Sequence, residues 1–136
     1  MAPNKILVVD DSDDTREMMS KLLELEAFTV VTAEDGSAGL SVAAVELPDL
    51  IITDVNMPNL NGIEMIRQLR KEPAFGCVPI MAITAYGTGV AEEAIAAGAD
   101  STATKPVQFK ALVAEVRELL HKSRLRGQPE PALPTD

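Results

Sequence analysis

The chain has 136 residues, of which 46% are apolar and only 3% aromatic, so its core must be built from aliphatic side chains and methionine. Its formal net charge of −9 argues against a nucleic-acid binder, because contacts with phosphates require a clustered positive face. The first residues lack the apolar segment of a signal peptide, and no apolar run approaches the length of a membrane span. We therefore expect a cytoplasmic protein with neither a membrane nor a direct nucleic-acid partner.

Five apolar segments of strand length alternate with five segments of helical periodicity. The strands are predicted at 5–10, 28–33, 49–54, 79–84 and 101–104. The helices are predicted from the polar cap residues 12–14 through an apolar stripe that ends at 23, over 37–46, from 63 to before Pro73, over 90–97 and over 108–123. Nearly continuous apolar strands that alternate with helices predict an α/β fold, in which helices cover both faces of a doubly wound parallel sheet.

The last residues are expected to lie outside the folded unit. We predict one domain over 1–124 and a flexible Pro-rich tail over 125–136, because the three prolines after Gly127 and the scarcity of apolar residues oppose regular structure. The basic residues Lys122, Arg124 and Arg126 are interpreted as complements of the dipole at the end of the last helix.

Several other side chains have structural interpretations. Met18, Met19 and Met65 are predicted to fill the core, because they recur at helical spacing among apolar residues. Gly98 is predicted to end a helix in a left-handed conformation. The single cysteine, Cys77, excludes an internal disulfide and is read as a small apolar or loop residue.

Polar residues with chemical potential stand where the predicted strands end. Parallel strands bring all their carboxyl ends to one edge of the sheet, so these residues are expected to converge. They are Asp10, Asp11, Asp54, Thr84 and Lys105. Three converging carboxylates would repel one another unless a divalent cation compensates, and oxygen-only ligands suit Mg²⁺. A hydroxyl and an ammonium nearby complete a site that could accept a phosphoryl group.

The ordered set of motifs resembles the receiver domain of two-component response regulators over nearly the whole chain, from Lys5 to about Arg124. The motifs are Asp10-Asp11 after the first strand, Asp54-Val55-Asn56-Met57-Pro58 with Gly62, Thr84-Ala85, and Lys105-Pro106. The resemblance implies a flavodoxin-like (βα)5 fold with strand order 2-1-3-4-5. It also implies that the Lys105-Pro106 peptide bond is cis.

The resemblance assigns the metal site to four residues. It implies that Asp11, Asp54 and the carbonyl of Asn56 ligate Mg²⁺, while Asp10 holds the ion through water. The cofactor expected from the resemblance is therefore Mg²⁺ alone.

The resemblance also implies the reaction and its partners. Asp54 would accept a phosphoryl group from a sensor histidine kinase or a histidine phosphotransfer protein. Lys105 would pair with the phosphoryl oxygens, and Thr84 would move to hydrogen-bond them. The chain would be a single-domain regulator that catalyses only its own phosphorylation and dephosphorylation. It would switch the binding of a downstream effector, which the sequence does not identify.

Two positions depart from the family pattern. Thr102 stands where receivers usually carry the aromatic partner of the switch threonine, and Val107 replaces a frequent phenylalanine. A threonine cannot bury the large apolar area of a rotating ring. We therefore hypothesise that phosphorylation moves Thr84 and the loop 85–90, which includes Tyr86, with little rearrangement around Thr102.

Three alternatives remain at this point. Residues 11–15 satisfy the D-x-D-x-T pattern of haloacid dehalogenase phosphatases, although the carboxylate that directly follows the strand is Asp10, one place out of register. A receiver-like module that binds partners without phosphorylation would also fit the missing aromatic residue. A flavodoxin-like cofactor domain is disfavoured, because Asp10 and Asp11 would repel a flavin phosphate.

Overall fold

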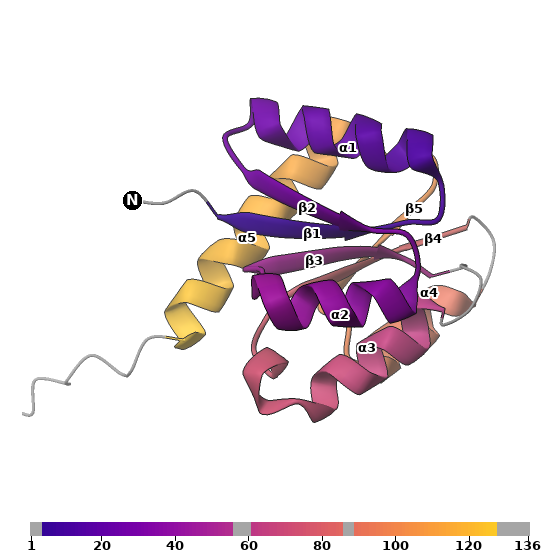
Figure 1. Ribbon diagram of the computed structural model, residues 1–136, viewed down its shortest axis with the longest axis vertical. Coiled ribbons are helices and arrows are strands. Elements are labelled where there is room, and N and C mark those ends of the chain that lie inside the picture. Colours follow the sequence, from indigo (N-terminus) through magenta and orange to yellow (C-terminus); the bar gives the residue numbers. More distant parts are fainter. Residues whose placement is uncertain (1–3, 56–60, 86–88, 128–136) are drawn as a thin grey trace, which may run out of the picture.

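Five parallel strands form one sheet in the order β2-β1-β3-β4-β5, which confirms the predicted fold class and strand order (Figure 1). The computed structural model describes residues 4–55, 61–85 and 89–127. The elements in chain order are β1 (Lys5–Val9), α1 (Asp13–Leu25), β2 (Thr29–Ala33), α2 (Gly36–Glu46), β3 (Leu50–Asp54), α3 (Gly62–Lys71), the 3-10 turn η1 (Pro73–Phe75), β4 (Ile80–Thr84), α4 (Val90–Ala97), β5 (Ser101–Thr104) and α5 (Phe109–Gly127).

Side chains of the strands alternate between the two faces of the sheet, as the pleat requires. Leu7 and Val9 of β1 belong to a core cluster that includes side chains of α2, α3 and α4. Ile6 and Val8 belong to a second cluster, which packs against α1 and α5. Figure 1 shows the same division, with α1 and α5 over one face and α2 and α3 over the other. Both faces are thereby removed from water, so polar groups that act together must lie at the strand ends.

Local sequence explains where the helices begin and end. Ser12, Asp35 and Asn61 cap α1, α2 and α3, because each side chain accepts a hydrogen bond from the backbone N–H three residues ahead. The short α4 begins at Gly89 without a side-chain cap. It ends at Gly98, whose φ of 127° confirms the predicted left-handed ending.

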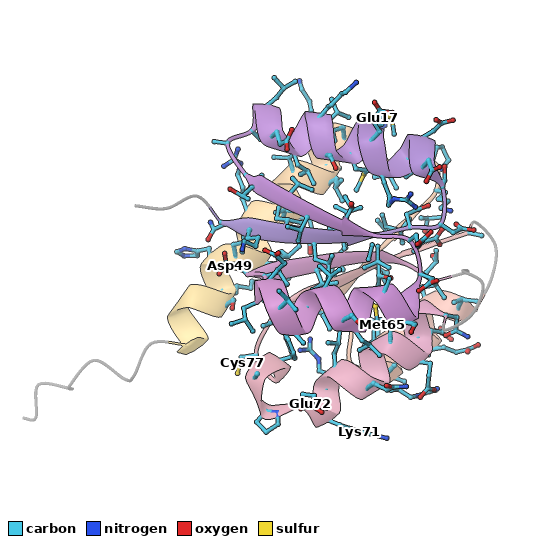
Figure 2. The ribbon with its side chains drawn as sticks, viewed as in Figure 1. Glu17, Asp49, Met65, Lys71, Glu72 and Cys77 are labelled. Carbon is cyan, nitrogen blue, oxygen red and sulfur yellow. The ribbon has the colours of Figure 1, made fainter. Side chains whose placement is uncertain are left out.

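Two predictions about helices need correction. Met19 and Met65 are buried, but Met18 is 55% exposed, because neighbouring helical residues point about 100° apart and cannot both face the sheet. Figure 2 shows Met65 directed from α3 toward the sheet. The last helix continues to Gly127 instead of ending near Ser123, since Arg124 and Leu125 are good helix formers.

The predicted domain boundary between residues 124 and 125 therefore falls inside α5. The part of the predicted tail from 128 onward lies outside the described residues. Within the described ranges, no helix combines the length and the apolar character needed to cross a membrane. Cys77 is exposed and lies near the amino ends of the strands, at the edge opposite to the predicted site (Figure 2).

Candidate functional site

The carboxyl ends of four strands lie level with one another. Three pairs of registered residues mark this edge: Val9 with Thr53, Asp54 with Ile83, and Thr84 with Thr104. Asp10 follows β1 directly, Asp54 is the last residue of β3, and Lys105 follows β5. The sheet therefore brings the predicted site residues to one edge, as expected from the parallel arrangement.

Three carboxylates form a compact cluster at this edge. One carboxylate oxygen from each of Asp10, Asp11 and Asp54 lies within 4.8 Å of the others. Asp10 and Asp54 are buried, whereas Asp11 is exposed. Clustered oxygen ligands fit a hard divalent cation such as Mg²⁺, which also tends to retain water molecules. Asn56, the fourth predicted ligand, lies outside the described residues.

The buried Asp10 carboxylate is held in place by the turn that follows it. Its Oδ1 accepts a hydrogen bond of 2.8 Å from the Ser12 backbone N–H. Its own N–H donates to the Ala33 carbonyl at 3.1 Å, which extends the pairing of β1 and β2 by one residue. Burial raises the pKa of Asp10, and the charge of nearby Asp54 raises it further. A cation in the cluster would relieve both costs.

The Lys105 ammonium pairs with the central carboxylate of the site. Its Nζ donates to Asp54 Oδ2 at 3.0 Å, and this hydrogen bond raises the pKa of Lys105. The Asp54 side chain is only 4% exposed, but that of Lys105 is 49% exposed. The Lys105 backbone N–H donates to the Thr84 carbonyl at 2.9 Å, and the Lys105-Pro106 bond is cis, as predicted.

Thr84 is buried at the end of β4, one residue beyond the position that pairs with Asp54. It is thus on the correct edge, but its motion toward a phosphoryl group stays a prediction. Tyr86 lies outside the described residues, so the predicted movement of the loop that includes it also stays a prediction.

Gly62 is required by the close approach of α3 to the end of β3. Its N–H donates to the Val55 carbonyl at 3.0 Å. A Cβ atom built on Gly62 would lie 2.4 Å from the Asp54 carbonyl oxygen and 2.9 Å from the Val55 Cα. Any side chain here would therefore push α3 away from the residue that carries the central carboxylate.

Sequence reasoning missed Arg16, which holds the acidic turn from the first part of α1. Its Nη1 donates to the Asp10 carbonyl at 2.6 Å, and its Nη2 pairs with the Asp13 carboxylate. An arginine three residues after a first-turn aspartate was the available signal, because residues at that spacing are neighbours on a helix.

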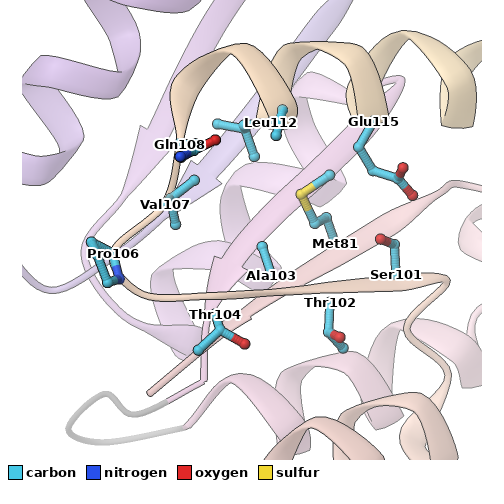
Figure 3. A pocket seen from close by; sticks show the side chains of 11 residues that line it. Met81, Ser101, Thr102, Ala103, Thr104, Pro106, Val107, Gln108, Leu112 and Glu115 are labelled. Atoms are coloured by element: carbon cyan, nitrogen blue, oxygen red, sulfur yellow. The ribbon is translucent and has the colours of Figure 1, made fainter. Parts of the chain in front are cut away.

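A groove of about 390 Å³ runs between β5 and α5 (Figure 3). Met81 forms part of its lining, with Leu112 and Glu115 of α5. In Figure 3, Thr102 points to the side of β5 opposite to Ser101 and Ala103. The cluster residues Asp10, Asp11 and Asp54 do not line this groove, so it is distinct from the predicted phosphoryl site.

The comparison with protein families gives one clear result: residues 6–117 match the model of the response regulator receiver domain. Among curated relatives, the response regulator PleD of Caulobacter vibrioides is 38% identical over 116 residues, which are 85% of this chain and 26% of PleD. The response regulator MprA of Mycobacterium ulcerans is 38% identical over 123 residues, which are 89% of this chain and 52% of MprA. The chain thus spans about a quarter to a half of the length of these two relatives.

Solved structures agree with the family match. A putative response regulator from Chloroflexus aurantiacus has a TM-score of 0.84 and 31% identity, and the match covers 88% of this chain and 98% of that one. The chemotaxis response regulator CheY4 of Vibrio cholerae has a TM-score of 0.81 and 32% identity, with coverage of 86% and 98%.

Proposed function

Because the chain belongs to the family of response regulator receiver domains, we propose that Asp54 is its phosphoacceptor in a Mg²⁺-dependent reaction with a phosphohistidine donor. Receiver domains are signalling domains, and a phosphoacceptor role is the general function of this family. Our proposal goes further than this general function. It names the phosphorylated residue, the metal ion, the phosphoryl donor and the kind of protein that receives the signal. The observation that carries it is the cluster of Asp10, Asp11 and Asp54 next to the Lys105 ammonium.

The proposed transfer is a displacement at phosphorus. A carboxylate oxygen of Asp54 forms the new P–O bond while the P–N bond to the donor imidazole breaks, and the electron pair of that bond stays on the imidazole nitrogen. The product is an aspartyl phosphate. Burial of Asp54 excludes most water from this carboxylate, and Lys105 is positioned to neutralise charge on the phosphoryl oxygens.

The metal ligands in this proposal come from two strand ends. Asp11 and Asp54 would hold Mg²⁺ directly, together with the Asn56 carbonyl, and Asp10 would hold it through water. When bound, Mg²⁺ supplies positive charge that offsets the carboxylates and the incoming phosphoryl group. Thr84 would then hydrogen-bond a phosphoryl oxygen and transmit the change to the surface around α4.

The donor is proposed to be a sensor histidine kinase or a histidine phosphotransfer protein. The signal is proposed to be received by an effector protein that binds the altered surface.

The phosphatase alternative loses its basis in the structure. Its motif forms the turn before α1 and the first turn of that helix, where Asp13 pairs with Arg16 and is not part of the described carboxylate cluster.

The proposal is tested by phosphorylation with acetyl phosphate and Mg²⁺, followed by intact-mass spectrometry. The wild-type chain should gain one phosphoryl group, which alkali should remove because acyl phosphates are labile. Asp54→Asn should remain unlabelled, whereas Asp49→Asn, at the other end of β3, should label like the wild type. Undiminished labelling of Asp54→Asn would refute the assignment.

A further inference from the structure

We infer that Arg16 is a positioning residue for the metal-binding carboxylates, because it fixes the peptide group between Asp10 and Asp11. This inference rests on the proposed function, in which these two residues hold Mg²⁺. It adds a residue from α1 that touches neither the metal nor the phosphoryl group.

The geometry of one hydrogen bond carries the argument. Arg16 Nη1 donates to the backbone carbonyl of Asp10 at 2.6 Å. That carbonyl belongs to the peptide group that joins Asp10 to Asp11, and a peptide group is planar. Holding its oxygen therefore fixes the orientation of this plane, which contains the N and Cα atoms of Asp11. The direction in which the Asp11 side chain leaves the backbone is fixed with it.

Arg16 itself is held at both ends of its guanidinium group. Its Nη2 pairs with the Asp13 carboxylate, one helical turn earlier in α1. The Arg16 side chain is 17% exposed, although it lies near the protein surface. A planar guanidinium can bridge two acceptors in a fixed geometry, whereas a lysine ammonium acts as a single charged point.

The two carboxylates of the turn differ in how much other support they have. Asp10 is fixed through its side chain by the Ser12 N–H and through its own N–H by the Ala33 carbonyl. Asp11 is exposed, and among the described residues no hydrogen bond holds its carboxylate. The Arg16 contact holds the peptide group before Asp11, while the Ser12 N–H bond to Asp10 Oδ1 holds the peptide group after it. The loss of Arg16 should therefore release one of the two constraints on the Asp11 backbone, and affect Asp11 more than the buried Asp10 carboxylate.

The test is calorimetric titration of the folded protein with Mg²⁺, well below its melting temperature. Arg16→Ala should bind Mg²⁺ about 10-fold more weakly or worse, since the loss of outer partners of metal ligands has effects of this size. Arg16→Lys should remain weak. Arg67→Ala is the matched control, because Arg67 also forms an i,i+3 pair, with Glu64 of α3, and should leave the affinity unchanged.

A second variant keeps the test decisive if Arg16→Ala folds poorly. Asp13→Ala removes the second anchor of Arg16 while leaving the guanidinium in place, and should weaken Mg²⁺ binding by a smaller factor. In the amide spectrum of this variant, the shifts should be centred on Asp11 and Ser12.

The outcomes separate the inference from the proposed function. Wild-type affinity in folded Arg16→Ala, or full restoration by Arg16→Lys, would overturn the positioning role and leave the proposed function standing. Absence of Mg²⁺ binding by the wild-type chain would overturn both. A change in unfolding free energy without a change in affinity would show that Arg16 is only structural, and would also overturn the inference.

Discussion

Two cation–carboxylate pairs in the molecule have similar distances and different surroundings. Arg70 Nη2 lies 2.8 Å from Asp100 Oδ2, and Lys105 Nζ lies 3.0 Å from Asp54 Oδ2. The first pair joins the end of α3 to the segment between α4 and β5. The second pair lies at the proposed phosphorylation site.

The Arg70 pair is surrounded by further hydrogen bonds. Three backbone carbonyls accept from the Arg70 guanidinium at 2.6 to 2.9 Å, namely those of Phe75, Val78 and Gly98. Asp100 Oδ2 also accepts from the Ile80 N–H at 2.9 Å. Both side chains are mostly buried, so the polar groups of this network rely on one another for hydrogen bonds in place of water. The arrangement is suited to hold the last turn of α4 in one place.

The Lys105 pair has the opposite character. The Lys105 side chain is half exposed and is bound through its ammonium to one carboxylate. The Asp54 carboxylate would exchange part of this contact for the phosphoryl group. The comparison indicates that α4 has a carboxyl end held by the Arg70 network, at Gly98, and an amino end without a side-chain cap, at Gly89, five residues after Thr84 in the chain. We therefore expect the signal to alter the amino end of α4.

The largest predicted effect on stability comes from breaking the Arg70–Asp100 pair, which we call the fixed pair. Arg70→Ala should lower the free energy of unfolding by about 2–4 kcal/mol, because it removes the charged partner of the mostly buried Asp100 carboxylate and the donor to the carbonyls of Phe75, Val78 and Gly98. Urea denaturation measures this change. Arg67→Ala, on the exposed face of the same helix, should stay within about 0.5 kcal/mol of the wild type. A similar loss in both variants would contradict the distinction.

The next effect is the response to metal at the site. Mg²⁺ at about 100 times its dissociation constant should stabilise the folded chain by about 2.7 kcal/mol. Asp11→Ala should reduce this gain and yet raise the stability without metal, because it removes like-charge repulsion. A melting temperature that stays constant through a titration into tens of millimolar Mg²⁺ would refute the site.

A smaller effect should appear in the pH dependence of stability without metal. The pKa of Asp10 is raised in the folded state above its ordinary value of 3.8, so the folded chain binds this proton more tightly than the unfolded chain. The contribution of Asp10 to stability therefore decreases as the pH rises from 3.8 through the folded pKa. Asp10→Asn should remove this decrease. The stability of the variant relative to the wild type should therefore be highest at neutral pH. Parallel stability curves for the two proteins from pH 4 to 7 would contradict it.

The smallest effect on stability is expected for the Lys105–Asp54 pair, which we call the movable pair. Lys105→Ala should change the free energy of unfolding by less than about 1 kcal/mol, because the lysine is half exposed. Because the folded pKa of Lys105 is raised, its contribution is present below its ordinary value of 10.5 and is lost as the pH rises through the folded pKa. The variant should still bind Mg²⁺. Its phosphorylation should no longer change the binding of the partner. A loss as large as that of Arg70→Ala would remove the contrast between the pairs.

The sequence predicts the site better than it predicts its supports. Asp54 and Lys105 could be placed together because each follows an apolar run, and parallel strands end at a common edge. The order of the strands came from the family resemblance, since hydrophobic periodicity does not determine which strands are neighbours.

Arg16 and Arg70 could not be found in the same way. Both lie on amphipathic helices, where a charged residue is expected to face water. Several of their partners are backbone carbonyls, which leave no pattern in the sequence. Met18 shows the complementary error, because its neighbour Met19 occupies the buried face.

The most direct test of the contrast between the fixed and the movable pair is a comparison of backbone amide spectra with and without beryllofluoride, a phosphoryl mimic, in the presence of Mg²⁺. We predict the largest shifts among the described residues at Asp54, Thr84, Ala85 and Gly89, with small shifts at Gly98–Asp100 and around Thr102. Equally large shifts at Gly98–Asp100 would show that the Arg70 network moves with the site. Such a result would contradict the assignment of a fixed carboxyl end to α4.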